Sequence, residues 1–308
     1  MKDDFELIIL TTANDFRRMR RLYWKIPKMI NTEHISIIGD AEVGNLVKEY
    51  NDPMFHFIDE ESLLSSAGIQ EILEERFSGQ TVQRGFVGWY YQQFLKMEYA
   101  RHAKCEWYMA WDGDTIPVRR IEMFAEEGKP YLDWKREYFP SYFRTINALF
   151  PDMNKTVEMS FISEHMLFST AIMNEMLKDI EQMEHLTGSS FYERILRSID
   201  KDDLNSNGFS EFETYGTYVG YRYTHVYKLR RWYSYRNCGQ YFGADDISEE
   251  EMDWLGKDFF AITFEKGHTP SPEASFLRDE KYRNKLSARQ FVEIIQEEST
   301  GGYRESWN

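Results

Sequence analysis

Short apolar runs alternate with longer mixed stretches over the first hundred residues of the chain. Three of the runs, Leu7–Thr12, Ile35–Gly39 and Met54–Ile58, have the length and β-branched composition of buried strands. The stretches between them have helical patterns, and the first predicted helix runs from an N-cap at Asn14 or Asp15 to about residue 25. Strands separated by helices predict a mostly parallel α/β sheet flanked by helices.

A helix predicted over Phe86–Ala103 has two unlike faces. At 100° per residue, its large apolar side chains gather on one half of the helical wheel. The opposite side carries Trp89, Gln92, Gln93 and Lys96. A solvated face normally carries several charges, so we interpret this face as the lining of a site.

The remaining pattern predicts one main domain with a helical appendage. Four further elements are predicted: a strand at Glu106–Trp111, a strand with its exit at Met159–Ser169, and helices at Ala171–Met183 and Ser287–Glu298. We place the main domain at residues 1–247 and a helical extension, packed on it, at residues 248–308.

Composition and charge narrow the classes of function. The 308 residues are 42% hydrophobic and 16% aromatic, which is enough for a large core. A formal net charge of −15 argues against nucleic-acid binding through a basic face, but an anionic ligand held through a metal ion remains compatible with it. Cys105 and Cys238 form no CxxC pair, and no apolar run reaches the roughly 18 residues of a membrane span. We expect a soluble cytoplasmic protein that can still associate with a membrane surface through a partner.

The clearest chemical motif is Asp112-Gly113-Asp114, which follows directly after the predicted strand EWYMAW. Two carboxylates spaced i, i+2 at the end of a strand can both turn toward one hard cation. Mg²⁺ or Mn²⁺ would bridge them to a diphosphate and neutralise charge on a leaving group. The alternative is a solvated acidic turn.

The run GWYYQQFLKMEYARHAKCEWYMAWDGDTIPVR resembles the donor-site region of bacterial GT-A glycosyltransferases long catalogued as a domain of unknown function and associated with surface polysaccharide assembly. Two later segments, SEHMLF at 163–168 and FSEFETYG at 209–216, are also similar to that family. The resemblance covers about residues 5–270. It implies a GT-A-like (Rossmann-like) fold, a nucleotide-diphospho-sugar donor with UDP as first choice, and a saccharide or lipid-linked saccharide acceptor.

Several residues receive roles that fit this resemblance. Thr11, Thr12 and Asp40, with Asp59 as a further candidate, follow predicted parallel strands, whose carboxyl ends collect ligands, and would contact the base and ribose. Trp89, Gln92 and Gln93 occupy the helix positions of the family pattern, and Lys96 would reach a phosphate. The predicted donor site is Thr11, Thr12, Asp40, Trp89, Gln92, Gln93, Lys96, Asp112, Gly113, Asp114 and His165.

An inverting transfer also needs a carboxylate base beside the acceptor hydroxyl. Glu211 is our first candidate, and Glu213 and Glu164 are the alternatives. A retaining transfer would need no such base. GT-A enzymes often add a histidine as a third metal ligand, for which we choose His268 first and His225 second.

Three other interpretations of the sequence stay open. A strand that ends in Asp-x-Asp is also the signature of Mg²⁺-dependent phosphatases of the haloacid dehalogenase class, although Ile116 stands where those enzymes usually have Thr or Val. The polar run from Asp203 to Gly208 matches the first six positions of an EF-hand loop, but Thr214 replaces the bidentate Glu at its twelfth position. A carbohydrate-binding protein without turnover is the third possibility.

Overall fold

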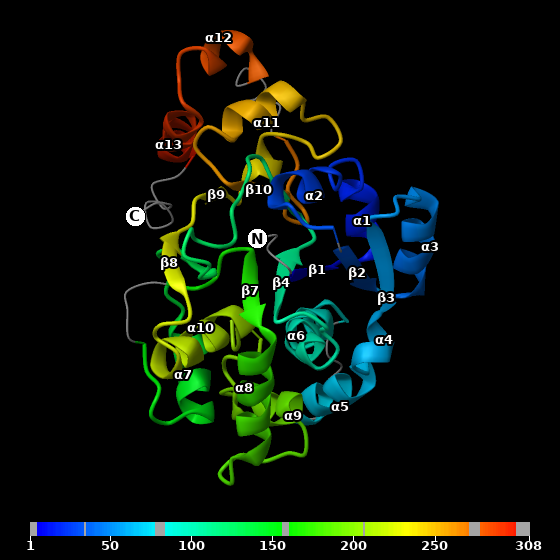
Figure 1. Cartoon of the computed structure of the whole chain (residues 1–308), viewed down its shortest axis with the longest axis vertical. Helices are drawn as coiled ribbons and strands as arrows, with labels where there is room; N and C mark the ends of the chain where they lie inside the picture. The colour runs from blue at the N-terminus through cyan, green and yellow to red at the C-terminus, as the bar shows by residue number, and fades with distance from the viewer. Residues whose placement is uncertain are drawn as a thin grey trace.

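A computed structural model of the chain describes residues 5–33, 35–77, 84–155, 160–205, 207–270 and 278–299. Its centre is a five-stranded sheet in the order β3-β2-β1-β4-β7 (Figure 1). These strands are β1 (Phe5–Leu10), β2 (Ile35–Gly39), β3 (Phe55–Asp59), β4 (Trp107–Asp112) and β7 (His165–Ser169). The first four are parallel and β7 is antiparallel to β4. The prediction of a mostly parallel central sheet flanked by helices is confirmed.

Helices cover both faces of this sheet (Figure 1). The helices are α1 (Ala13–Met19), α2 (Lys25–Ile30), α3 (Ala41–Tyr50), α4 (Glu60–Leu63), α5 (Ser66–Arg76), α6 (Arg84–Glu98), η1 (Tyr99–Arg101), α7 (Pro140–Leu149), α8 (Thr170–Gln182), α9 (Phe191–Ser198), α10 (Glu211–Arg222), η2 (Cys238–Gln240), α11 (Glu249–Leu255), α12 (Glu280–Arg283) and α13 (Ala288–Ser299). Helices α5–α10 lie on one side of the sheet, whereas α1, α2, α11 and α13 lie on the other (Figure 1).

The pleat of the strands divides the interior into two hydrophobic cores. In β4, Met109 and Trp111 point into the core under α1 and α2, and the alternate residues Tyr108 and Ala110 point into the core under α6 and α8. Burial on both faces explains why these strands appear as continuous apolar runs in the sequence. It also fixes the register, because a shift of one residue would exchange the two faces.

Two small sheets lie beside the central one. They consist of β5 (Thr115–Pro117), β10 (Ala261–Thr263) and β9 (Ser234–Tyr235), in the order β5-β10-β9, and of β6 (Tyr131–Trp134) with β8 (Lys228–Arg231). Because β10 joins β5 to β9, the segment predicted as a purely helical extension from residue 248 also supplies a strand. Residues 271–277 and 300–308 of that predicted extension lie outside the described residues.

Some predicted boundaries need correction. β1 ends at Leu10, and Thr12 rather than Asn14 or Asp15 is the N-cap of α1. The helix predicted to run to residue 25 ends at Met19, and α2 begins only at Lys25. Pro27 accounts for the interruption, because proline is tolerated in the first turn of a helix but breaks the bond pattern of an interior turn.

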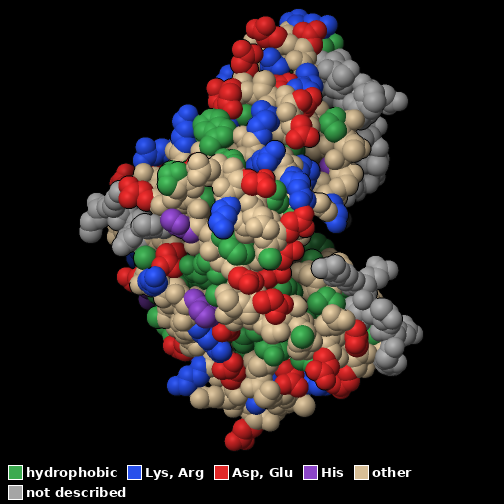
Figure 2. All heavy atoms as spheres, turned by 90° about the vertical axis from the view of Figure 1, so that its right-hand side faces the viewer, with side chains coloured by type: hydrophobic (Ala, Val, Ile, Leu, Met, Phe, Trp, Pro, Cys, Tyr) green, Lys and Arg blue, Asp and Glu red, His purple; other side chains and the backbone are tan. Residues whose placement is uncertain are grey.

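The start of β7 also differs from the prediction. β7 begins at His165, well after the start predicted for that strand, and Met159 lies outside the described residues. Within the described residues, neither Cys105 nor Cys238 forms a disulfide. No helix in the described ranges combines the length and hydrophobicity needed to span a bilayer. On the face shown in Figure 2, basic and acidic side chains are interspersed.

Candidate active site at the carboxyl end of β4

The Asp112-Gly113-Asp114 motif lies where β4 leaves the central sheet and turns into β5. A side chain at Gly113 would place its Cβ 2.7 Å from the carbonyl oxygen of Leu10 and 3.1 Å from the Cβ of Thr11. Glycine therefore allows the turn to pack against the end of β1. The hydroxyl of Tyr23 donates to the Gly113 carbonyl at 2.8 Å and holds the turn from the other side.

Asp114 is an acidic group that lacks a close cationic partner within hydrogen-bond distance among the described residues. Its contact in the structure is with the hydroxyl of Thr115, which donates to Oδ1 at 3.4 Å. Burial, followed by the nearby carboxylates of Asp112 and Glu265, raises the pKa of Asp114 to about 7. A bound cation would stabilise the ionised form of Asp114 and so oppose this shift.

Lys96 connects Asp112 to Glu211. Its ammonium nitrogen donates to Oδ1 of Asp112 at 2.8 Å and to Oε1 of Glu211 at 2.7 Å, and it lies 4.4 Å from the ring centre of Phe212. The Lys96 side chain is only 4% exposed, whereas that of Asp112 is 31% exposed. The polar face of α6 therefore does face the interior, as the sequence indicated. In this arrangement Lys96 pairs with two carboxylates, and its contact with a phosphate stays a prediction.

The other polar residues of α6 lie along the same face. Gln93 is buried, and its side-chain oxygen accepts from the backbone N–H of Glu211 at 3.2 Å while its amide donates to the carbonyl of Trp89 at 3.1 Å. Trp89 and Gln92 are half-buried. Gln93 and Lys96 together fix the first residue of α10 beside the end of β4.

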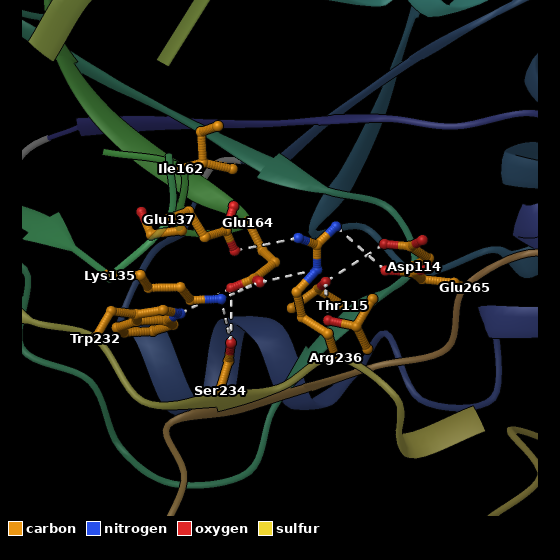
Figure 3. Close-up of polar contacts among 12 residues, drawn as sticks. Asp114, Thr115, Lys135, Glu137, Ile162, Glu164, Trp232, Ser234, Arg236 and Glu265 are labelled. Carbon is orange, nitrogen blue, oxygen red and sulfur yellow. Dashed lines mark hydrogen bonds and ion pairs between the residues drawn. The ribbon is translucent and has the colours of Figure 1, made fainter. Parts of the chain in front are cut away.

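Glu164, one of the three predicted bases, is fully engaged by neighbouring side chains. Lys135 pairs with Oε1, while the Trp232 indole and the Ser234 hydroxyl both donate to Oε2 at 2.9 Å (Figure 3). Burial alone would raise the pKa of Glu164, but Lys135 and Arg236 lower it below its ordinary value. Glu164 also adopts a left-handed conformation, with φ at 59°, and its carbonyl accepts from the backbone N–H of Asp112 at 2.9 Å. The neighbouring side chains thus hold Glu164 in place, and its carbonyl in turn holds the backbone of Asp112.

Glu213, the second alternative base, contacts the segment that begins at Ser160. Its Oε2 accepts from the Ser160 hydroxyl at 2.5 Å and from the Phe161 backbone N–H at 3.2 Å. Burial raises the pKa of Glu213. Among the three carboxylates, Glu211 is the one that Lys96 ties directly to Asp112.

His165 occupies a closed polar cluster under the motif. Its Nε2 lies 2.9 Å from Asp133 and its Nδ1 lies 2.8 Å from the carbonyl of Ser163, while the ring centre lies 4.2 Å from that of Trp232. The side chain is 1% exposed. Both ring nitrogens have partners inside the protein, and the part of His165 in binding the donor stays a prediction.

The polar residues at the strand ends act as helix caps. Thr12 and Asp40 accept from the backbone N–H groups of Asp15 and Val43, at 3.2 and 3.0 Å. Asp59 caps α4 in the same way. Thr11 is half-buried beside Gly113 and Tyr23. Thr11, Thr12, Asp40 and Asp59 thus lie at the carboxyl ends of β1, β2 and β3, and their contact with a nucleoside stays a prediction.

The third metal ligand predicted from the sequence is not assembled with the motif. Within the described ranges, no three His, Cys, Asp or Glu side chains gather into a metal-binding group, so Asp112, Asp114 and His268 do not form a ready three-ligand site. Nε2 of His268 lies 3.8 Å from Oε2 of Glu265 and 3.4 Å from Nε2 of Gln240. The other ring nitrogen, Nδ1, is buried and has no hydrogen-bond partner in the described part of the chain. His225 is exposed in the turn after α10.

The carboxylates at the motif nevertheless fit a hard cation shared with a substrate. Mg²⁺ and Mn²⁺ prefer oxygen ligands, and Mg²⁺ usually takes one or two protein carboxylates together with phosphate oxygens instead of a complete protein cage. Asp112 and Asp114 provide such a pair, and burial followed by the neighbouring carboxylates raises the pKa of Asp114.

Two residues near the motif escaped the sequence analysis. Glu265 follows β10, where the backbone N–H of Phe264 donates to the Asp114 carbonyl at 2.9 Å. Arg236 follows β9, and its guanidinium lies between Glu137 and Glu164 on one side and Asp114 and Glu265 on the other (Figure 3). No local motif surrounds either residue in the sequence, because the three-residue β10 and the two-residue β9 bring them to the site.

The EF-hand interpretation is not supported by the fold. Arg144 makes a two-pronged contact with Asp203, whose carboxylate oxygens lie 2.6 to 2.9 Å from its nitrogens. The carbonyl of Asn207 accepts from Ser141. The first position of the proposed calcium loop is therefore held by an arginine.

The chain belongs to a family of unknown function, DUF6492, whose model matches residues 8–278. The predicted membership of a family catalogued by its unknown function is confirmed to that extent. No curated protein matches the chain significantly.

Similar solved structures are those of glycosyltransferases. Mouse xyloside xylosyltransferase 1 is 12% identical, with 87% of this chain and 100% of that one covered and a TM-score of 0.44. The galactosyltransferase LgtC, solved with donor and acceptor sugar analogues, is 13% identical, with 96% and 97% covered and a TM-score of 0.38. The bifunctional glycosyltransferase WbbM is 12% identical, with 96% of this chain and 52% of that one covered and a TM-score of 0.44.

Proposed function

We propose that the chain is a divalent-cation-dependent glycosyltransferase of the GT-A type. It would move a sugar from a nucleotide-diphospho-sugar, with UDP as the first choice, to a saccharide or lipid-linked saccharide in surface polysaccharide biosynthesis. The observation that carries the proposal is the Asp112-Gly113-Asp114 turn at the carboxyl end of a buried parallel strand. There, burial and the nearby carboxylates of Asp112 and Glu265 raise the pKa of Asp114 to about 7. The resemblance of residues 88–119 to a glycosyltransferase donor site supports the same function.

Each side chain has a defined task in this proposal. Asp112 and Asp114 would hold Mn²⁺ or Mg²⁺, which when bound neutralises charge on the departing diphosphate. Lys96 fixes the orientation of Asp112, because its buried ammonium donates to one carboxylate oxygen, while the Asp112 side chain remains 31% exposed. Gly113 keeps the turn against β1, so that the nucleoside would lie over Thr11 and the neighbouring strand ends.

The acceptor side of the reaction follows from the same contacts. For an inverting transfer, Glu211 is the proposed base, because Lys96 holds it next to Asp112. Glu164 and Glu213 are held by Lys135 and Ser160 respectively and would serve the structure of the site. No observation favours the phosphatase or the binding protein without turnover over this proposal.

The test is calorimetric titration of UDP and GDP, with and without Mn²⁺, on the wild type and Asp114→Ala. We expect nucleoside diphosphate binding that needs Mn²⁺ and that weakens at least about 100-fold in Asp114→Ala, because the cation and the phosphates share this ligand. Asp246→Ala, which removes an exposed carboxylate outside the motif, is the matched control. If neither nucleotide binds the wild type in the presence of Mn²⁺, the proposal is wrong and phosphatase substrates should be tried next.

A further inference from the structure

Arg236 is held much more loosely than the structural arginines of this protein. Arg230 contacts Asp133 at 2.6 and 2.7 Å, and Arg278 contacts Glu251 at 2.7 and 3.0 Å, in both cases through two nitrogens. Arg236 instead approaches three carboxylates, Glu265 at 3.2 Å, Glu137 at 3.4 Å and Glu164 at 3.6 Å. The side chain of Arg236 is also 45% exposed, against 15% for Arg230.

The geometry explains the loose contacts. The three carboxylates come from separate segments: the loop after β6, the residue before β7 and the residues after β10. Figure 3 shows the guanidinium between them, with Glu137 and Glu164 on one side and Glu265 on the other. A planar fork matches one carboxylate or phosphate at a time, so it cannot pair closely with all three. Arg236 thus neutralises charge without forming a fixed pair.

Arg236 also lies beside the proposed cation site. Glu265 contacts its guanidinium at 3.2 Å, and the preceding residue, Phe264, donates its backbone N–H to the Asp114 carbonyl at 2.9 Å. Asp112 likewise acts electrostatically on Arg236. A positive charge at this place stabilises the carboxylates when no other cation is present and opposes a divalent cation that approaches them.

We propose that Arg236 is an exchangeable counter-ion of the active site, which neutralises Glu265 and its neighbours in the free protein and moves to a phosphate oxygen of the substrate when a diphosphate binds with its cation. This inference rests on the function proposed above. Asp112 and Asp114 would hold the cation, whose positive charge would then compensate these carboxylates in place of the Arg236 guanidinium. A phosphate offers the two-pronged partner that the three scattered carboxylates do not.

The proposal predicts effects of opposite sign for one substitution. In Arg236→Gln, Mn²⁺ alone should bind about threefold tighter or more, because a positive charge near its ligands has been removed. UDP in saturating Mn²⁺ should bind about 10- to 100-fold weaker, because a charge-assisted hydrogen bond to phosphate has been lost. Arg236→Lys keeps the charge, so Mn²⁺ should bind as in the wild type, while UDP binding should recover only in part without the planar fork.

Calorimetry on the full chain measures both affinities, and thermal melting shows whether each variant is folded. Arg120→Gln is the matched control, since Arg120 is 68% exposed and pairs with Glu122 away from the motif; neither affinity should change. If Arg236 has only a structural role, its substitution should weaken the binding of both Mn²⁺ and UDP or of neither. Either result would overturn the proposed exchange of Arg236 between carboxylates and phosphate.

The outcomes also separate this inference from the proposed function. Wild-type binding of UDP that Arg236→Gln leaves unchanged would refute the exchange and leave the function standing. If the wild type binds Mn²⁺ but no nucleoside diphosphate, the proposed function fails, and the movement of Arg236 to a phosphate fails with it. Binding of neither ligand would refute both proposals.

Discussion

Two polar clusters lie near each other in this protein and differ in how closely their charged groups are paired and how deeply they are buried. In the cluster of Asp133, His165 and Arg230, each carboxylate oxygen and ring nitrogen has a partner at 2.6 to 2.9 Å, and the Asp133 and His165 side chains are each 1% exposed. In the cluster around Asp114, the contacts of Glu265 and Arg236 are longer and the side chains are more exposed.

This difference suggests how to tell a structural charge cluster from a binding one. Charges that are closely paired in a buried cluster have no hydrogen-bonding capacity left for a ligand. The cluster of Asp133, His165 and Arg230 instead holds β6, β7 and β8 together. Loosely paired charges at a strand end leave partners to be supplied from outside. Substitutions in the first cluster should therefore change stability, and those in the second should change binding.

The largest effect on stability is expected for Asp133→Ala. The substitution leaves Arg230 and the buried His165 without their shared carboxylate, and loss of one partner from a buried charge network costs about 3–5 kcal/mol. Asp133→Asn keeps part of the hydrogen bonding and should cost less. The free energy of unfolding from urea titration measures both. A loss under about 1 kcal/mol for Asp133→Ala would mean that this cluster is as loosely coupled as the other.

An intermediate effect is expected from pH in the cluster around Asp114. Below pH 3.8 this carboxyl is protonated in both the folded and the unfolded chain. As pH rises toward 7, the unfolded chain releases the proton first, so the free energy of unfolding decreases. At about 1.4 kcal/mol for each unit of pKa difference, the loss amounts to a few kcal/mol.

Asp114→Asn isolates this contribution from those of other carboxyls. In metal-free buffer, the stability of the variant should fall less than that of the wild type between pH 4 and 7, as measured by urea titration at each pH. Mn²⁺ should restore the free energy of unfolding of the wild type at pH 7 and leave that of Asp114→Asn unchanged. Parallel pH profiles of the two proteins would contradict the unbalanced charge that we assign to this cluster.

The smallest effect separates two roles of Asp40, which caps α3 through the backbone N–H of Val43. Asp40→Ala should lower the free energy of unfolding by about 1 kcal/mol, because a helix cap is lost. Asp40→Ser keeps a capping oxygen, so its stability should stay close to that of the wild type. If Asp40 also contacts the nucleoside, both variants should weaken Mn²⁺-dependent UDP binding in calorimetry. Unchanged binding in both would leave Asp40 a cap alone.

The sequence predicted the fold well where side-chain periodicity is strong. The strands around Ile35–Gly39 and Glu106–Trp111 and the polar inner face of α6 follow from local pattern, because buried strands and amphipathic helices need it. The small sheets were missed. β10 has three residues, and its partners are separated from it in sequence, so no local periodicity marks it.

The site was predictable in its centre and not at its edges. The Asp112-Gly113-Asp114 motif is local, and the structure places it at the carboxyl end of β4. The polar residues after β1 and β2 were ambiguous, because threonine and aspartate serve equally as helix caps and as ligands. Arg236 and Glu265 could not be found, since long-range pairing of β9 and β10 brings them to the motif.

The contacts of Phe264 and Thr263 have a consequence for the order in which the protein matures. The Phe264 backbone N–H bonds to the Asp114 carbonyl at 2.9 Å, and the hydroxyls of Thr115 and Thr263 lie 2.8 Å apart. During translation, the motif leaves the ribosome long before these partners do. The growing chain can form β1–β4 early, yet the Asp114 turn gains its last supports only after residue 264 has emerged. Competence to bind a ligand there would thus arise late in synthesis, after the central sheet is already in place.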